Sequence, residues 1–114
     1  MDIRKEDGVV VMRLTAADLN APQPTLDILQ RAVQDDSEQK IVADLSAIES
    51  IYSLQIGTLV AMHVLCYENV AVMKLSGVNE KVKNLLRMVG LEAMMEMHHG
   101  ASVAIQSFGP REGG

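Results

Sequence analysis

The chain has 114 residues and a formal net charge of −5, and 48% of its residues are hydrophobic although it has no Trp and only one Phe. This length suits one domain, whose core must be built from aliphatic side chains and methionine. The acidic balance argues against nucleic acid and against an anionic membrane surface as partners, because both require a basic patch.

The N-terminal stretch is predicted to form an antiparallel hairpin. Asp2 to Lys5 is a short edge strand, Asp7-Gly8 is a turn signal, and Val9 to Leu14 is an apolar strand. Alternation along this second strand separates two sets of side chains onto opposite faces, namely Val10, Met12 and Leu14 on one face and Val9, Val11 and Arg13 on the other.

The segment from Thr15 to Ala21 is expected to be a connection that leads into the first helix. Asn20 is the predicted N-cap of this helix and Thr25 is the alternative, because the prolines between them suit a first helical turn. The helix is expected to run to about Gln34, and a solvated acidic turn follows it.

The next unit reads as a strand, a short polar turn and an apolar helix. Lys40 to Leu45 is of strand length, and the segment from Leu54 to Cys66 is too long and too apolar for a loop, which predicts a helix. Ser53 is its predicted N-cap, where free backbone N–H groups and the helix dipole favour an anion. The helix is apolar nearly all round, which indicates burial on several sides.

A second strand–helix unit follows. Val70 to Leu75 is predicted to be a strand, with Lys74 on one face and Met73 on the other. Asn79 is the predicted N-cap of the next helix, and Gly90 is its predicted C-terminal stop.

The C-terminal part is expected to be less regular. Met94 to Met97 predicts a brief last strand, Ala101 to Ser107 a short final helix, and residues 111–114 a loose tail. Strands that alternate with helices imply parallel pairing with right-handed crossovers.

The predicted fold class is therefore α/β, in one small domain spanning residues 1–110. Its sheet has four or five mostly parallel strands, and the helices lie mainly on one face. The Ser53 helix would then lie between its two neighbours. The other face would carry Arg13 and Lys74 among valines, and it would either be solvated or meet another chain.

The sequence predicts a binding protein and not an enzyme, with no cofactor and no metal. It has no glycine-rich phosphate loop, and His98-His99 are adjacent, which is poor geometry for a metal. Asp44 ends a strand at the edge where α/β sheets place their sites, although a role as a turn acceptor is the simpler interpretation. The methionines of the C-terminal third are either core filler or an adaptable partner surface.

The location of the protein is predicted from its N-terminus and its cysteine content. The first residues are charged, with no signal-peptide apolar region, and the single Cys66 excludes an internal disulfide. We therefore expect a cytoplasmic protein.

Three loops are expected to meet at one end of the sheet, because each follows a strand and precedes a helix: Thr15 to Thr25, Ser50 to Ser53, and Ser76 to Asn79. A partner is expected to dock there, with Ser53 near the centre. The predicted partner-binding residues are Asn20, Tyr52, Ser53, Leu54, Gln55, Gly57, Gly77 and Asn79.

The stretch VADLSAIESIYSLQIGTLVAM resembles the signature of STAS domains, the anti-sigma factor antagonist family. Members show a strand ending in Asp-Leu, a short turn, and Asp-Ser-Ser/Thr-Gly at a helix start. Downstream, VAVMKLSGVNEKVKNLLRMVGLEAM is similar to the family's following strand and helix, and LNAPQPTLDILQRAV is similar to its first helix. The resemblance implies that Ser53 is the phosphoacceptor. Tyr52, Leu54 and Gln55 depart from the family pattern.

The resemblance also implies a function. The family's partner is an anti-sigma factor with serine kinase activity, which binds the domain, phosphorylates it and then loses affinity for it, while a phosphatase resets the switch. The alternative is a non-phosphorylated scaffold subunit that assembles with itself or with other STAS proteins. A small-molecule site at the carboxyl edge of the sheet is a third hypothesis.

Overall fold

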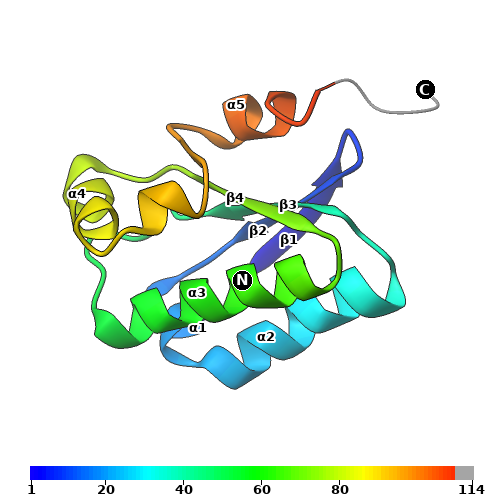
Figure 1. Cartoon of the computed structure of the whole chain (residues 1–114), viewed down its shortest axis with the longest axis horizontal. Coiled ribbons are helices and arrows are strands. Elements are labelled where there is room, and N and C mark those ends of the chain that lie inside the picture. Colours follow the sequence, from blue (N-terminus) through cyan, green and yellow to red (C-terminus); the bar gives the residue numbers. More distant parts are fainter. Residues whose placement is uncertain (110–114) are drawn as a thin grey trace.

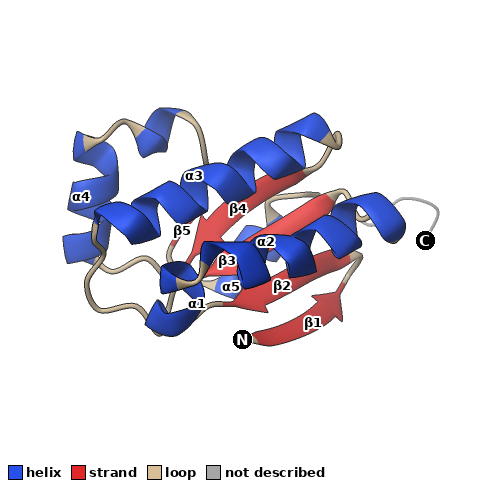
Figure 2. Ribbon diagram, turned by 90° about the horizontal axis from the view of Figure 1, so that it is seen from below, coloured by secondary structure: helices blue, strands red, loops and turns tan. Residues whose placement is uncertain are grey.

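A computed structural model gives the fold and describes residues 1–109. Within that range five strands form a single sheet in sequence order, and only the first pair is antiparallel (Figure 2). The strands are β1 (Asp2–Glu6), β2 (Val9–Arg13), β3 (Lys40–Asp44), β4 (Val72–Ser76) and β5 (Met97–His98). The predicted hairpin and the mostly parallel α/β fold are confirmed.

The helices are distributed unequally over the two faces of the sheet. They are α1 (Ala16–Asn20), α2 (Pro22–Gln30), α3 (Ser53–Glu68), α4 (Glu80–Met88) and α5 (Ala101–Gln106). A π-helical segment, Arg31–Asp35, continues α2, and a 3-10 turn, Leu91–Ala93, follows α4. Figure 1 shows α1, α2 and α3 on one face and α5 on the opposite face, with α4 beyond the ends of the strands.

The side-chain alternation predicted for β2 holds and divides the interior into two layers. Val10 and Met12 join the main core beneath α1 to α4, whereas Val9 and Val11 face α5. The main core is aliphatic, as the composition requires, and its largest fully buried members include Leu19, Leu29, Ile41, Leu59, Met62, Leu75 and Leu86.

The second face of the sheet is neither solvated nor free for another chain over its middle, because α5 covers it. Ala104 and Ile105 pack against the valines of β2 and β3. The buried Lys74 side chain holds the end of this helix: its Nζ lies 2.9 Å from the Ser107 hydroxyl and 4.2 Å from the centre of the Phe108 ring. A 3.0 Å ion pair with Glu96 completes the contact.

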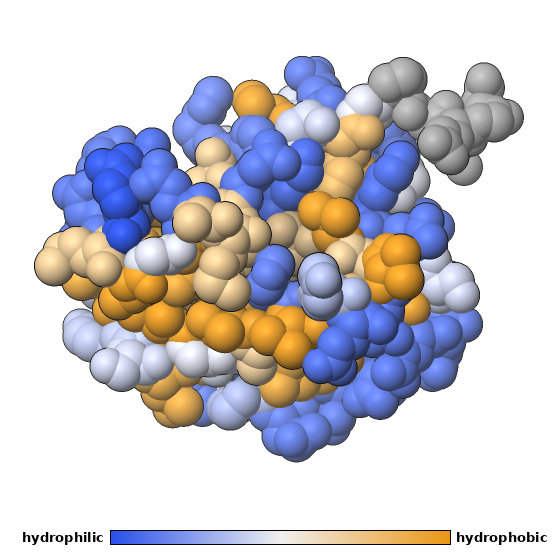
Figure 3. Space-filling view, viewed as in Figure 1, coloured by the Kyte–Doolittle hydropathy of each residue, from blue (hydrophilic) through white to orange (hydrophobic). Residues whose placement is uncertain are grey.

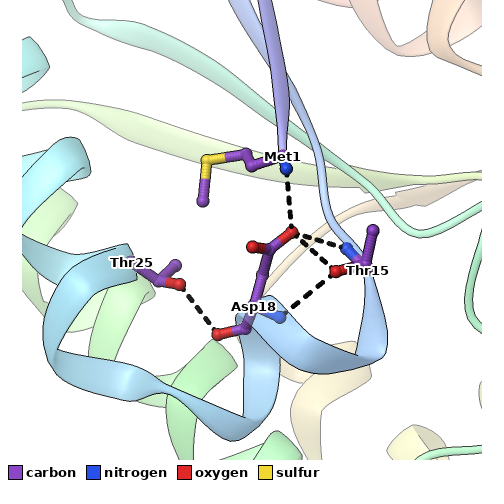
Figure 4. Close-up of polar contacts among 4 residues, drawn as sticks. All are labelled: Met1, Thr15, Asp18 and Thr25. Carbon is purple, nitrogen blue, oxygen red and sulfur yellow. Dashed lines mark hydrogen bonds and ion pairs between the residues drawn. The ribbon is translucent and has the colours of Figure 1, made fainter.

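The predicted connection before α2 contains a further helix, α1, and its caps correct two expectations. Thr15 is the N-cap of α1 through a capping box with Asp18, and Asn20 is the last residue of α1, so Asn20 is not an N-cap. Thr25 lies inside α2, where its hydroxyl donates to the Asp18 carbonyl over 2.8 Å (Figure 4). The Thr-x-x-Asp spacing is the signal that marks the start of α1.

Asp18 also binds the N-terminus of the chain, since its carboxylate lies 3.5 Å from the Met1 ammonium (Figure 4). Burial raises the pKa of Asp18, but the hydrogen bonds from the Thr15 N–H and hydroxyl and the attraction of the ammonium outweigh it, so the pKa lies below its usual value. The start of β1 is thereby fixed to α1.

Two further boundaries differ slightly from the expected ones. The strand expected from Val70 begins at Val72, because Val70 has a positive φ of 58° that no strand residue adopts. The last strand is Met97–His98, so it begins where the predicted one ends. Gly90 has a φ of 85° and ends α4 as predicted. Residues 111–114, the predicted tail, lie outside the described residues. No helix within residues 1–109 is long and apolar enough to cross a membrane.

Candidate functional site

The carboxyl ends of the parallel strands meet in one register, which brings the loops after β2, β3 and β4 together. Asp44 pairs with Ser76 of β4, and Ser76 pairs with His98 of β5. Main-chain bonds continue past the strand ends, from Leu45 N–H to the Ser76 carbonyl over 2.8 Å and from Gly77 N–H to the His98 carbonyl over 3.0 Å. The loops therefore leave the sheet from fixed positions.

Asn79 joins the loop before α4 to the loop before α3. Its Oδ1 accepts from the Val82 N–H over 2.8 Å, which makes it the N-cap of α4 as predicted. Its Nδ2 donates to the carbonyls of Ile48 and Glu49 over 3.2 and 3.1 Å. These two bonds hold the loop before α3 against α4, and we call them the Asn79 clamp. The sequence predicts the cap. It does not predict the clamp, because the clamp joins residues 30 positions apart and no local pattern indicates such a contact.

Gly77 has a structural reason to be glycine. Its φ is +66°, and a Cβ on it would lie 2.7 Å from the Asp44 Oδ1 and 2.9 Å from Ser46. The same Asp44 oxygen accepts from the Ser46 N–H over 3.0 Å, so the buried carboxylate is the turn acceptor of the simpler interpretation. The β4–α4 loop can pass this close to the β3–α3 turn only without a side chain at residue 77.

The start of α3 differs from the prediction in its cap. The N-cap is Tyr52, and Ser53 is the first helical residue. The Tyr52 N–H donates to Oε1 of Gln55 over 3.0 Å, so an amide three residues into the helix satisfies the backbone before it. Gln55 is buried for this purpose, at 3% exposure.

Ser53 stands on the surface of this helix start. The residue is exposed, and within residues 1–109 its hydroxyl has no hydrogen-bond partner. Its neighbours Tyr52 and Leu54 are also exposed, at 68% and 55%. Backbone N–H groups of the first turn lie beside the hydroxyl without intrahelical partners, which makes the surroundings favourable to negative charge.

Asn20, the last residue of α1, lies at the same end of the molecule as the start of α3. The carbonyl of the preceding Leu19 accepts from the buried Thr58 hydroxyl over 2.7 Å, and Thr58 also donates to the Leu54 carbonyl. The end of α1 is therefore fixed beside the first turns of α3. Sequence reasoning missed Thr58, because a threonine in an apolar helix gives no signal of a partner 39 positions away.

The charges at this end of the sheet come from several elements, and they include Arg13 at the end of β2, whose Nε donates to the Ser46 hydroxyl over 3.3 Å. The sequence has no Lys or Arg between Lys40 and Lys74, while Glu49 and Glu80 flank the loops that meet at this end. No cluster of three or more potential metal ligands occurs in the described part of the chain. Burial raises the pKa of the Cys66 thiol on α3 to about 12, which makes it a core residue and not a nucleophile.

The methionines divide between the two interpretations. Met95 is buried in the core at 3% exposure, whereas Met88 and Met94 are exposed at 80% and 45%. The exposed pair belongs to the end of α4 and to the turn after it.

Comparison with known proteins identifies the class. The STAS domain model matches residues 1–104, so this chain belongs to the STAS domain family. A search of curated proteins found no match.

Solved structures share the fold over nearly the whole chain. One is an anti-sigma-factor antagonist (STAS) domain protein from Planctomyces limnophilus, with 18% identity and a TM-score of 0.77 over 93% of this chain and 95% of that one. Another is RsbS of Moorella thermoacetica with a serine replaced by glutamate, with 18% identity and a TM-score of 0.80 over 93% and 92%. A third comes from the stressosome, described as a signal integration and transduction hub, with 18% identity and a TM-score of 0.82 over 93% and 94%.

Proposed function

We propose that this chain is a binding module of a partner-switching system, regulated by phosphorylation of Ser53. Its partner is an anti-sigma factor with serine kinase activity, and a phosphatase reverses the modification. The single observation that carries the proposal is the exposed Ser53 hydroxyl in the first turn of α3 of a STAS domain. We also propose a cytoplasmic location, because such a kinase would require ATP.

The chemistry of the switch belongs to the kinase. The Ser53 Oγ forms a bond to the γ-phosphorus of ATP, the bond to the leaving ADP oxygen breaks, and the hydroxyl proton passes to a base on the kinase. This chain supplies the acceptor and its position. Within residues 1–109 the Ser53 hydroxyl makes no hydrogen bond that the transfer would have to break, and the residue is exposed.

The fold is expected to tolerate the phosphate, whereas the interface is not. A phosphoryl group adds a charge of about −1.5 to −2, and at a helix N-terminus that charge is favourable. The exposed neighbours Tyr52, Leu54 and Gly57 are uncharged, and no cation occurs between residues 40 and 74. A partner surface complementary to this neutral patch would have to desolvate the phosphate without a counter-ion, so the complex dissociates.

The docking site includes the residues around Ser53, namely Asn20, Tyr52, Leu54, Gln55, Gly57, Gly77 and Asn79. They divide by what they do in the free chain. Asn20, Tyr52, Leu54 and Gly57 are exposed and available for contact, whereas Gln55, Gly77 and Asn79 hold the loops in place. We expect the first group to affect affinity directly and the second to act through the shape of the site.

Phosphorylation is tested by incubating the chain with the cognate kinase and ATP and locating the phosphate by mass spectrometry. One phosphate on Ser53 is expected, and Ser53→Ala should abolish it. Ser50→Ala serves as the matched control, because Ser50 lies in the adjoining loop. Modification that survives Ser53→Ala contradicts the assignment.

The scaffold alternative is supported by Gln55. The family signature has glycine there, and in this chain a buried amide side chain fills the position and stabilises the helix start. A constitutive subunit of a signalling assembly would bind its partner with the same affinity whether residue 53 is serine or aspartate. The two functions therefore differ in one measurable respect.

A further inference from the structure

We propose that the outward face of α3 is a self-association surface, on which a second copy of this chain packs its own α3 in the antiparallel direction. The proposal concerns the isolated chain, and it does not depend on a kinase or on phosphorylation of Ser53.

The outward face of α3 has the spacing of a helix–helix seam. Residues alternately four and three positions apart lie along this side of the helix, namely Ser53, Gly57, Val60, Val64 and Tyr67. Four of them are exposed, whereas Val60 is half-buried and packs partly against the core. Val64 and Tyr67 are exposed at 42% and 78%. Figure 3 shows hydrophobic residues gathered over part of this side of the molecule, in the region of α3.

No contact within residues 1–109 accounts for a glycine at position 57. It lies inside a helix, where glycine is unfavourable, its φ is not positive, and a Cβ placed on it would have nothing within 4 Å. Gly77 shows the contrast, because there a Cβ would collide with Asp44 and Ser46. A glycine on the exposed side of an apolar helix suits close approach of another backbone.

The charge on this face selects the antiparallel direction. Glu68, at the C-terminal end of α3, is its only side chain with a full charge. In a parallel pair the two Glu68 carboxylates would lie side by side. In an antiparallel pair each carboxylate lies beside the first turn of the other α3, whose free N–H groups and dipole attract it.

The antiparallel pair also places side chains opposite suitable positions. With Val60 at the twofold axis, Ser53 lies opposite Tyr67 of the second copy, and Val64 lies close to Gly57 of the second copy. The two dipoles oppose each other along the seam. The face is thus complementary to itself.

A groove beside the seam supplies the remaining apolar contact. It has a volume of about 370 Å³ and lies between α2 and α3, where its walls include Leu26, Ala61 and Leu65. A twofold axis that reverses α3 keeps the α2 side of both copies on the same side of the pair. Leu54 of the second copy, which is 55% exposed in the free chain, therefore lies over this groove.

The mass of the isolated chain in solution tests the proposal. By light scattering at tens of micromolar we expect about twice the chain mass of 12.4 kDa. Val64→Lys places a charge in the seam and should weaken association by at least about tenfold. Met88→Lys is the matched control, since Met88 is 80% exposed but lies on α4, and it should leave the mass unchanged.

Disulfide cross-linking then tests the direction. A mixture of Ser53→Cys and Tyr67→Cys chains should cross-link with each other, whereas each variant alone should cross-link poorly. The native Cys66 is buried and does not compete. A wild-type chain that remains monomeric, a dimer that Val64→Lys leaves intact or that Met88→Lys disrupts equally, or cross-linking of each variant only with itself would each overturn the proposal.

Discussion

The hydroxyl of Thr58 donates to the carbonyl of Leu19 over 2.7 Å, and both residues are buried. This bond joins α3 to the end of α1, and it thereby places Asn20 beside the helix that begins at Ser53. Neither residue is exposed to a partner, yet together they set the relative position of two of the loops at the site.

We predict that Thr58→Val lowers the free energy of unfolding by about 1–3 kcal/mol, because the Leu19 carbonyl is left buried without a donor. Amide exchange in α1 should also become faster. Thr58→Ser is the control: it keeps the hydroxyl, so exchange in α1 should stay slow even though the lost methyl group lowers global stability. Equal amide exchange rates in α1 for Thr58→Val and Thr58→Ser would show that the hydrogen bond from Thr58 does not hold α1 in place.

Asn79 performs two tasks that substitutions separate. Asn79→Ser retains a good N-cap for α4 but cannot reach the carbonyls of Ile48 and Glu49, so the loop before α3 should exchange its amides faster while α4 stays protected. Asn79→Ala should lose the cap as well, at about 1 kcal/mol more. Hydrogen exchange by mass spectrometry distinguishes the two. Unchanged exchange around residues 46–52 in both variants would contradict the clamp.

Gly77→Ala should destabilise the domain more than Gly90→Ala does. Both glycines have a positive φ, so alanine at either position costs about 1–2 kcal/mol of backbone strain. A Cβ at residue 90 meets nothing within 4 Å, whereas at residue 77 it collides with Asp44 and Ser46. Overpacking there adds about 1–3 kcal/mol. Thermal unfolding of the pair checks the difference, and equal losses would show that the close approach is unimportant.

Asp18 predicts how stability changes in acid. Its pKa in the folded chain lies below the usual value of an aspartate, so the unfolded state takes up the proton first as the pH falls. Its stabilising contribution is therefore present above about pH 4 and is lost as the pH falls through the lower folded pKa. Urea unfolding of wild type and Asp18→Asn should differ most near neutral pH and converge in acid. A difference that grows towards low pH would contradict this assignment.

The sequence predicts the elements well where the signal is local. The alternation of β2, the cap at Asn79 and the stop at Gly90 all depend on neighbours within a few residues, and the structure confirms them. The prediction that Ser53 is the N-cap was wrong. Gln55 accepts from the Tyr52 N–H from inside the helix, so Tyr52 is the N-cap and α3 begins one residue earlier than predicted.

Long-range contacts are the part that local patterns do not contain. Helix α5 covers the second face of the sheet, and the hydrogen bond that holds its end joins Lys74 to Ser107, 33 positions away in the sequence. A helix of six residues is too short for its hydrophobic periodicity to indicate which surface it packs on. The clamp from Asn79 to Ile48 is of the same kind. The sequence therefore locates the end of the sheet where the site lies, whereas the contacts that shape the site require the structure.

The central claim is that negative charge at residue 53 releases the partner without disturbing the fold. The most direct measurement is the affinity of the isolated kinase partner for wild type, Ser53→Ala and Ser53→Asp. Aspartate is accepted at a helix start, and Ser53 is not the N-cap, so all three chains should unfold at similar temperatures. We predict that Ser53→Ala binds like wild type and that Ser53→Asp binds at least about a hundredfold more weakly, because an unpaired charge must be buried. Equal affinity of wild type and Ser53→Asp, with the fold intact, would contradict the switch and favour the scaffold.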